Sequence, residues 1–438
     1  IGAPNGPVTQ KDFRLALVTD PEYATYFGAA NVTAEKATLI NRVNQVYMDD
    51  LAIRFLLIAE NDLLNLDTSE LATGAGGPCG ASGCFTQAQL DGGCTGGLLD
   101  RNSFVTGQIV GADSFDIGHI ALGGGGGGVA GLGVVGGASK AQGCTGLPTP
   151  EGDFFAIDYV AHEIGHQMGG DHTFNGTQRN CSSTNRALTP FTTQVEPGSG
   201  SSVMAYAGIC QQDNLQPHSD PYFAAASIEQ ITGVVADDTA TADEQQVVNL
   251  EGFDGTDAFT ISCAGCATSD PVVNGALTYN NLTVAIAVSQ ATGETVTPLE
   301  INDYEAAFPD LSVPSADGFT VDFAIASGAT DIPTLVITPT SGTFTSFTGT
   351  IVNGGPTTNE GTSDVTANTN PVVTAPADKT LPIRTPFELI GTGTDDDGDP
   401  LVYLWEQTDP GGLLGTALVD NNKTQGPLFR IFGTYADV

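Results

Sequence analysis

Hydrophobic and polar residues follow two different periods along the chain, and the change of period divides it. Near the N-terminus, the short apolar runs at 13–18 and 53–58 predict strands. Between them, apolar residues recur every four positions over 33–51, which predicts a helix. From about residue 240 onward, apolar and polar residues alternate, as in 318–326, which predicts strands. This order predicts an α/β (α+β) domain followed by all-β modules.

Two more helices are predicted in the middle of the chain. The segment 151–168 begins with acidic residues, and Gly169 and Gly170 follow it, as at many helix C-termini. Its apolar positions recur every four residues: Ala156, Val160, Ile164 and Met168. The second helix is predicted over 220–231, and a strand is predicted over 129–135.

The length of 438 residues favours two or three domains. We expect an α/β domain over 1–240 and a β-rich module over 241–355. The apolar-poor segment 356–370 is interpreted as a linker. A β-sandwich is expected over 371–438, and we expect it to be incomplete because the chain stops at Val438.

Charge restricts the classes of partner. The chain carries 13 Lys and Arg against 51 Asp and Glu, a net charge of −38. Such a surface repels phosphate backbones and anionic lipids, so we expect neither nucleic acid nor a membrane surface as a partner. No apolar run approaches the length of a membrane span. We expect a monomer, whose acidic surface serves solubility or suits divalent cations.

Eight cysteines form an even set. The chain starts at Ile1 without a leader, so we expect either a mature protein or an excised piece of a longer one. Its acidic, Gly- and Thr-rich texture favours an oxidising compartment, so we expect it to be secreted and extracellular. Sequence alone leaves the pairing open. Our interpretation joins neighbours: Cys79 with Cys84, Cys94 with Cys144, Cys181 with Cys210, and Cys263 with Cys266.

Three of the five histidines lie within the predicted helix 151–168 and the residues just after it. His162 and His166 are four positions apart, so on a helix they can offer imidazole nitrogens to one ion. The next turn of the same helix cannot supply a third ligand with tetrahedral geometry. The freedom of Gly169 allows the chain to turn and bring His172 back. Three imidazoles with an open fourth position predict a catalytic zinc site.

Glu163 follows the first of these histidines and lies slightly around the helix from it. A carboxylate there can take a proton from the attacking water and pass it to the leaving amine, which is the chemistry of peptide hydrolysis. About thirty residues downstream, the stretch 199–210 holds Met204 and Tyr206.

The pattern HExxHxxGxxH with a downstream SxMxY resembles the metzincin clan of zinc endopeptidases. Within the clan, the segments 196–210 and 219–231 are most similar to secreted bacterial reprolysin-like metallopeptidases. The resemblance implies His162, His166 and His172 as zinc ligands, Glu163 as general base and Met204 as the hydrophobic floor of a methionine turn. It also implies that 129–135 is an edge strand that pairs with an extended substrate.

The chain departs from this family at two positions. Adamalysin-type members have Asp after the third histidine, where this chain has Thr173. Their methionine turn commonly continues to Pro, whereas Tyr206 stands here, as in astacin- and serralysin-like enzymes. The resemblance to the latter makes Tyr206 a candidate fifth ligand and oxyanion donor, the alternative being a packed tyrosine bonded to the backbone.

The segment 371–438 looks similar to PKD-like or cadherin-like accessory domains. Its turn offers Asp395, Asp397 and Asp399 with the alternation that calcium sites use, although the EF-hand template does not fit. A calcium site and a plain acidic turn both remain open. The two other histidines, His119 and His218, are interpreted as structural hydrogen-bonding groups rather than outer-shell partners of the metal.

The sequence therefore predicts a secreted zinc metalloendopeptidase that hydrolyses extended protein or peptide substrates. Two alternatives remain. One is a catalytically weak binding or adhesion protein with a zinc fold, acting through its β modules, against which the intact Glu163 argues. The other is a zinc hydrolase of another class, such as an amidase acting on cell-wall material.

Overall fold

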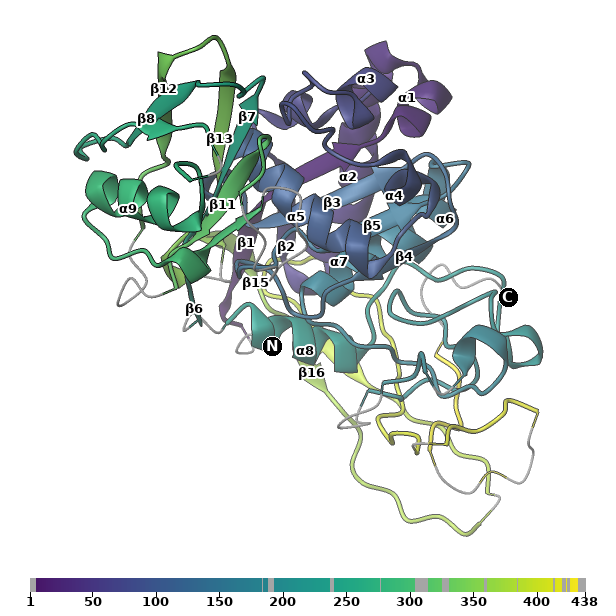
Figure 1. The fold of residues 1–438 in the computed structure, drawn as a ribbon. Helices are drawn as coiled ribbons and strands as arrows, with labels where there is room; N and C mark the ends of the chain where they lie inside the picture. Colours follow the sequence, from purple (N-terminus) through teal and green to yellow (C-terminus); the bar gives the residue numbers. More distant parts are fainter. Residues whose placement is uncertain are drawn as a thin grey trace.

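A computed structural model of the chain places the N-terminal apolar runs side by side in one sheet, with helices packed against it (Figure 1). The structure describes residues 5–431 except 183, 188–192, 237–239, 276, 304–313, 325–330, 358–360, 384, 413, 420–422 and 424–425.

The central sheet has six strands in the order β15-β1-β3-β5-β4, with β2 also paired to β1. Strand β1 pairs in parallel with β2 and β3, whereas β4 runs antiparallel to β5 and forms an edge. The strands are β1 (Pro7–Thr19), β2 (Ile53–Leu57), β3 (Ile117–Leu122), β4 (Gly127–Ala130), β5 (Gly143–Gly146) and β15 (Thr362–Thr369). The edge strand therefore begins and ends earlier than the predicted 129–135.

Helices cover both faces of this sheet. Phe13, Leu15 and Leu17 of β1 pack into one core with α2 and the later helices, while Ala16 and Val18 pack into a second core with α5. The helices are α1 (Pro21–Phe27), α2 (Val32–Leu51), α3 (Ser69–Thr73), α4 (Gln87–Asp91), α5 (Gly96–Val110), α6 (Gly152–Phe155), α7 (His162–Gln167) and α8 (Ala225–Val234). The helix predicted over 33–51 is confirmed as α2.

The helix predicted over 151–168 is confirmed as one continuous run with a local change of winding. It consists of α6, a π-helical segment η4 (Ala156–Ala161) and α7. Single π turns inside α-helices frequently occur at functional sites. Gly169 ends the run with a φ of 100°, and a Cβ atom there would lie 2.4 Å from Val234 Cγ2. Glycine is therefore required at this bend both by backbone geometry and by close packing.

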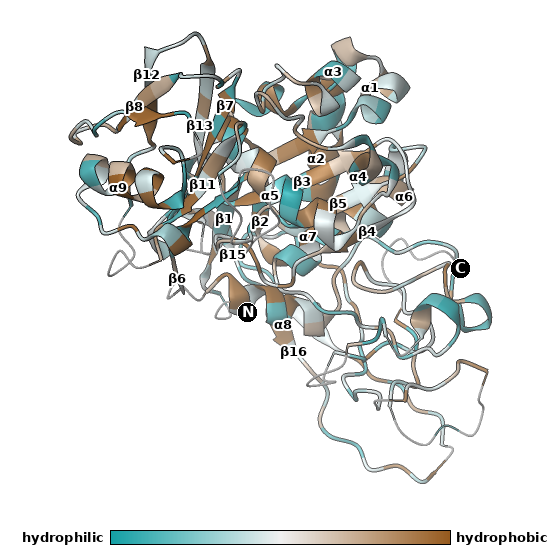
Figure 2. Cartoon of the chain, viewed as in Figure 1, coloured by the Kyte–Doolittle hydropathy of each residue, from teal (hydrophilic) through white to brown (hydrophobic). Residues whose placement is uncertain are grey.

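A second body with its own core follows α8 (Figure 2). Its two larger sheets have the strand orders β10-β11-β7-β13 and β12-β8-β9, and a small sheet pairs β14 with β6. Residues 325–326 of the predicted strand 318–326 lie outside the described residues. The strands are β6 (Ala240–Ala242), β7 (Gln245–Glu251), β8 (Ala258–Ser262), β9 (Val272–Val273), β10 (Ile301–Asp303), β11 (Gly318–Asp322), β12 (Val336–Ser341), β13 (Thr345–Val352) and β14 (Gly355–Thr357).

This body is β-rich but not all-β, because it contains helix α9 (Asn281–Thr292). Val284, Ile286 and Val288 alternate as in a strand. The buried positions nevertheless follow a helical period, namely Val284, Ala285, Ala287, Val288 and Ala291. Asn280 and Thr283 form a capping box that starts the helix. Small alanines on the buried face let the helix pack, so tertiary context overrides the β-propensity of this segment.

The segment interpreted as a linker, 356–370, supplies a strand to the first domain. Its strand β15 pairs antiparallel with β1, with Asp12 opposite Thr362 and Thr9 opposite Val365. The segment was predicted to be a linker, so the strand differs from the prediction. Exposed Thr and Ser side chains suit an edge strand whose backbone is paired on one side. In the described part of 371–438, β16 (Val372–Thr374) pairs with β17 (Thr392–Thr394). The PKD-like or cadherin-like sandwich stays a prediction.

The described C-terminal residues run along the loops of the first domain (Figure 1). The backbone N–H of Thr416 donates to the Asn175 carbonyl at 2.8 Å, and that of Leu418 donates to Asp213 Oδ1 at 2.6 Å. Glu406 accepts from the backbone N–H of Ala225 at the start of α8, at 2.8 Å. The C-terminal segment thus contacts the loops between α7 and α8 and the start of α8.

All eight cysteines are paired, and the neighbour pairing expected from the sequence is confirmed. The pair Cys181–Cys210 joins the loop after the third histidine to the end of the stretch containing Met204. Within the described residues, no helix combines the length and the hydrophobicity that a bilayer crossing requires.

Candidate metal centre

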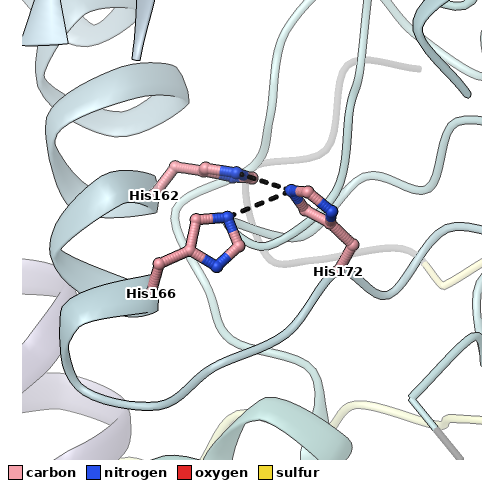
Figure 3. Close-up of side chains that lie close together, drawn as sticks. All are labelled: His162, His166 and His172. Atoms are coloured by element: carbon pink, nitrogen blue, oxygen red, sulfur yellow. Dashed lines mark hydrogen bonds between the residues drawn. The ribbon is translucent and has the colours of Figure 1, made fainter. Parts of the chain in front are cut away.

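The three histidines predicted as ligands meet at one point. His162 and His166 lie on α7, and the chain reverses after Gly169 so that His172 faces them (Figure 3). The Nε2 atom of His172 lies 3.2 Å from that of His162 and 3.0 Å from that of His166. Among the residues that the structure describes, this is the one cluster of three or more such side chains whose donor atoms converge closely enough for one metal ion.

Hydrogen bonds to backbone carbonyls orient each ring. The Nδ1 atoms of His162, His166 and His172 lie 2.7, 2.7 and 2.5 Å from the carbonyl oxygens of Val203, Gly170 and Asn185. A carbonyl oxygen only accepts, so each Nδ1 carries the proton and each Nε2 presents a lone pair. The dashed contacts of Figure 3 therefore join lone pairs that repel unless a cation lies between them.

The donor set fits zinc. Zinc binds imidazole nitrogen at about 2.0–2.1 Å in tetrahedral geometry, which separates two ligand nitrogens by roughly 3.3 Å. The two Nε2 separations at His172, 3.0 and 3.2 Å, are close to that value. Burial lowers the pKa of all three imidazoles, to about 3 for His162, where the neighbouring His166 adds to the effect. Neutral rings are the form that binds a metal.

Glu163 and His162 line a cleft with a volume of about 250 Å³. Burial raises the pKa of the Glu163 carboxyl to about 8, and a nearby cation would lower that pKa again. The side chain lies against edge strand β4, since a Cβ atom at Gly128 would be 2.4 Å from both Cγ and Oε1 of Glu163. The glycine at 128 therefore makes room for the carboxylate itself.

Met204 lies directly beneath the helix that carries the first two histidines. It is fully buried, and a Cβ atom at Gly165 would be 2.4 Å from its Sδ. Gly165 thus allows the methionine to approach the helix between His162 and His166. Because Val203 also orients His162 through its carbonyl, the turn at Val203–Met204 supports the triad by packing and by hydrogen bonding.

Tyr206 lies against the triad. Its ring stacks on Phe174 at a centroid distance of 4.6 Å and lies 4.6 Å from the His172 ring. Burial raises the pKa of its phenol above the ordinary value, so the hydroxyl stays protonated and can donate a hydrogen bond. The tyrosine lines the cleft together with Glu163.

A buried carboxylate that sequence reasoning missed connects the residue after the third histidine to the turn before Met204. Glu196 is 1% exposed, and its oxygens accept from Thr173 Oγ1 and Ser202 Oγ, each at 2.5 Å. It also accepts from the backbone N–H groups of Ser201 and Ser202, at 2.8 and 3.1 Å. Thr173, at the position where adamalysin-type members have Asp, therefore has a hydrogen-bond acceptor in Glu196. The sequence signal was weak, being one acidic residue before a Gly- and Ser-rich turn.

We expect Glu196→Gln to weaken zinc binding up to about tenfold, the lower end of the 10–100-fold cost of losing a group bonded directly to a ligand, because Glu196 acts through Thr173 and the turn before Met204. The amide cannot accept from all four donors, so Thr173 and the turn before Met204 should shift. Competition with a chromophoric chelator measures the affinity. Thr173→Ser, which keeps the hydroxyl, and Glu244→Gln, at a buried carboxylate of the second body, serve as controls with near-normal affinity. Equal affinity in Glu196→Gln and the parent would contradict this role.

The other predicted residues lie apart from the triad. His119 is fully buried between Gln167 Oε1 and Thr145 Oγ1, at 2.9 and 2.8 Å, and burial lowers its pKa to about 4. It ties α7 to β3 and β5, in keeping with the structural interpretation. His218 packs edge-on against Phe154 near the cleft.

Asp395, Asp397 and Asp399 form a hydrogen-bonded turn. Asp395 Oδ1 accepts from the backbone N–H groups of Asp397 and Asp399, at 2.9 and 3.2 Å. Asp397 Oδ2 accepts from the backbone N–H and the hydroxyl of Thr369, at 2.6 and 2.8 Å. This turn tethers the C-terminal segment to β15, and a calcium ion here stays a prediction.

Comparison with known proteins agrees with this geometry. Residues 29–232 match the family model described as metallo-peptidase family M12B, reprolysin-like. This match supports a metzincin-type zinc metallopeptidase. The matched range is somewhat less than half of the chain and contains the triad, Glu163, Met204 and Tyr206. Hydrolysis of peptide bonds is thus supported for the reprolysin-like domain at the level of the family.

No curated protein matches the chain. Solved structures that match include a chain titled "Structure of a chaperone-substrate complex", with 13% identity and a TM-score of 0.25. The alignment covers 51% of the present chain and 37% of that chain. A TM-score this low carries no argument about fold or function.

Proposed function

We propose that the protein is a secreted zinc endopeptidase that cleaves extended protein substrates, with Glu163 as general base. The observation that carries the proposal is the meeting of three imidazole lone pairs next to a cleft that is lined by His162 and the buried carboxylate of Glu163. The reprolysin-like match to residues 29–232 supports it. Paired cysteines are consistent with an extracellular setting.

His162, His166 and His172 would hold the zinc, and their Nδ1–H bonds to carbonyls keep the rings in the binding orientation. When bound, zinc supplies Lewis-acid chemistry, which polarises a carbonyl and makes water a better nucleophile at neutral pH. Glu163 takes the proton of the attacking water and delivers it to the nitrogen of the leaving amine. The protonated phenol of Tyr206 donates a hydrogen bond to the oxygen on which negative charge develops.

The edge strand β4 provides the place for an extended substrate. It pairs with β5 on one side, and Gly126, Gly127 and Gly128 line the cleft. Backbone hydrogen bonds between β4 and a peptide would add a strand to the sheet. Such pairing would bring the peptide backbone close to Glu163, whose side chain lies against Gly128 of β4.

Casein hydrolysis by the purified chain tests the proposal. We expect cleavage that a chelator abolishes and that stoichiometric zinc restores, because the reaction needs the metal that the triad holds. Peptidoglycan, offered in parallel, separates a peptidase from a cell-wall amidase. A protein that carries one zinc per chain but releases no peptide from casein would contradict the proposed function and favour a binding role.

A further inference from the structure

The cleft beside Glu163 contains a second carboxylate, that of Asp158. Asp158 lies on the π-helical segment η4, about one turn before His162, and is half-buried. Phe154 and Tyr159 of the same helical run also line the cleft, together with Ala207 and Ser219 from the later loops. The position is therefore a short distance along the cleft from the triad.

Asp158 has hydrogen-bonding partners but no cationic one among the described residues. Its Oδ1 accepts from the backbone N–H of Ser219 at 2.8 Å. The charge that acts on it is another carboxylate, Asp153, which is itself paired with Arg42. No Lys or Arg is among the described residues that line the cleft.

Physical chemistry favours a cation at this position. Burial raises the pKa of Asp158 to about 7, against the hydrogen bonds from Ser219 that lower it. A carboxylate held in such a place is stabilised by an incoming positive charge. The net charge of −38, with no Lys or Arg between Arg186 and Lys379, also attracts cationic segments of a substrate.

The walls of the cleft suit the rest of a basic side chain. Phe154 and Tyr159 are in edge-to-face contact, with ring centroids 5.2 Å apart, and both line the cleft. Lysine and arginine bury an aliphatic stem against apolar surface, and a guanidinium also stacks on aromatic rings. Beside Glu163, the cleft thus combines two aromatic rings with the carboxylate of Asp158.

We propose that this cleft receives a lysine or arginine side chain next to the scissile bond of the substrate, with Asp158 as its charge partner. This inference rests on the proposed peptidase function and adds a substrate class to it. Asp158 acts in specificity, by binding the side chain beside the reacting bond, and takes no part in the proton transfers of Glu163.

Mapping of cut sites in casein, followed by matched peptides, tests the inference. We expect Lys or Arg to be enriched on one side of the cleaved bonds. Peptides that differ only there, with lysine against norleucine or arginine against citrulline, should differ in kcat/KM by at least about tenfold, as expected for a hydrogen bond to a charged group. In Asp158→Asn, whose amide oxygen can still accept from Ser219, this ratio should fall to near 1.

Glu151→Gln is the matched control, since Glu151 is an exposed carboxylate at the start of the same helical run and does not line the cleft. It should keep the parent ratio. If the parent cleaves both peptides of a pair equally, the inference is wrong while the peptidase proposal stands. If Asp158→Asn slows both peptides equally and keeps the ratio, Asp158 only supports the loop at Ser219. A zinc-loaded parent that cleaves no peptide removes both proposals together.

Discussion

Replacing Glu163 with glutamine should leave one zinc bound per chain and lower casein hydrolysis by on the order of 10²–10⁴-fold, the usual contribution of general acid–base catalysis. Glutamine has nearly the same shape, so the contact with Gly128 of β4 is kept. It cannot accept the proton of the attacking water. Metal content by mass spectrometry and initial rates of peptide release measure the two effects separately.

The position of Glu163 allows loss of the base to be separated from loss of the metal. Glu163 has a buried carboxyl on α7, yet it is not one of the three residues whose nitrogens converge. Glu151→Gln is a useful comparison, because Glu151 is an exposed carboxylate near the start of the same helical run and should behave as the parent. Retention of parent activity by Glu163→Gln would show that another group serves as the base.

Replacing His172 with alanine should weaken zinc binding by more than about 100-fold, beyond the 10–100-fold cost typical of an outer-shell change. The imidazoles of His162 and His166 remain on α7, but the third ligand nitrogen is lost. Activity should be lost with the metal. Equilibrium dialysis against buffered zinc gives the affinity, and the thermal midpoint with and without zinc should differ in the parent but not in the variant.

His119→Ala is the matched control for this experiment. His119 is buried beneath the same helix, and its loss leaves Gln167 and Thr145 without their partner, which should lower stability. Its nitrogens do not face the triad, so zinc stoichiometry should stay at one. If His119→Ala loses zinc as readily as His172→Ala, metal loss reports general destabilisation rather than ligation.

These results decide between the peptidase hypothesis and the binding-protein hypothesis. Zinc-loaded parent and Glu163→Gln proteins that both fail to release peptide would direct attention to the second body. That body has its own core and packs against α5 of the first domain. The backbone of Thr350 and Ile351 lies so close to Gly107 of α5 that a Cβ atom at position 107 would be 2.6 Å from Ile351 Cα. It is therefore built onto the reprolysin-like domain rather than loosely attached to it.

The sequence by itself determined the features that depend on neighbours in the chain. Four-residue spacing predicted the helix that carries His162 and His166, and Gly169 predicted the bend after it. The neighbour pairing of the cysteines was one interpretation that the sequence left open, and the structure has it. The motif with its methionine turn also led to the family that residues 29–232 match.

Only the tertiary structure decided the features that depend on distant residues. The proton positions on the three imidazoles depend on carbonyls up to 41 residues away, and Glu196 acquires its role because Thr173 and Ser202 meet around it. Strand β15 joins β1 across most of the chain, and α9 is helical although its β-branched residues alternate. Periodicity records which face of an element is buried, but not which group packs against it. That information arises only when the fold brings the partners together.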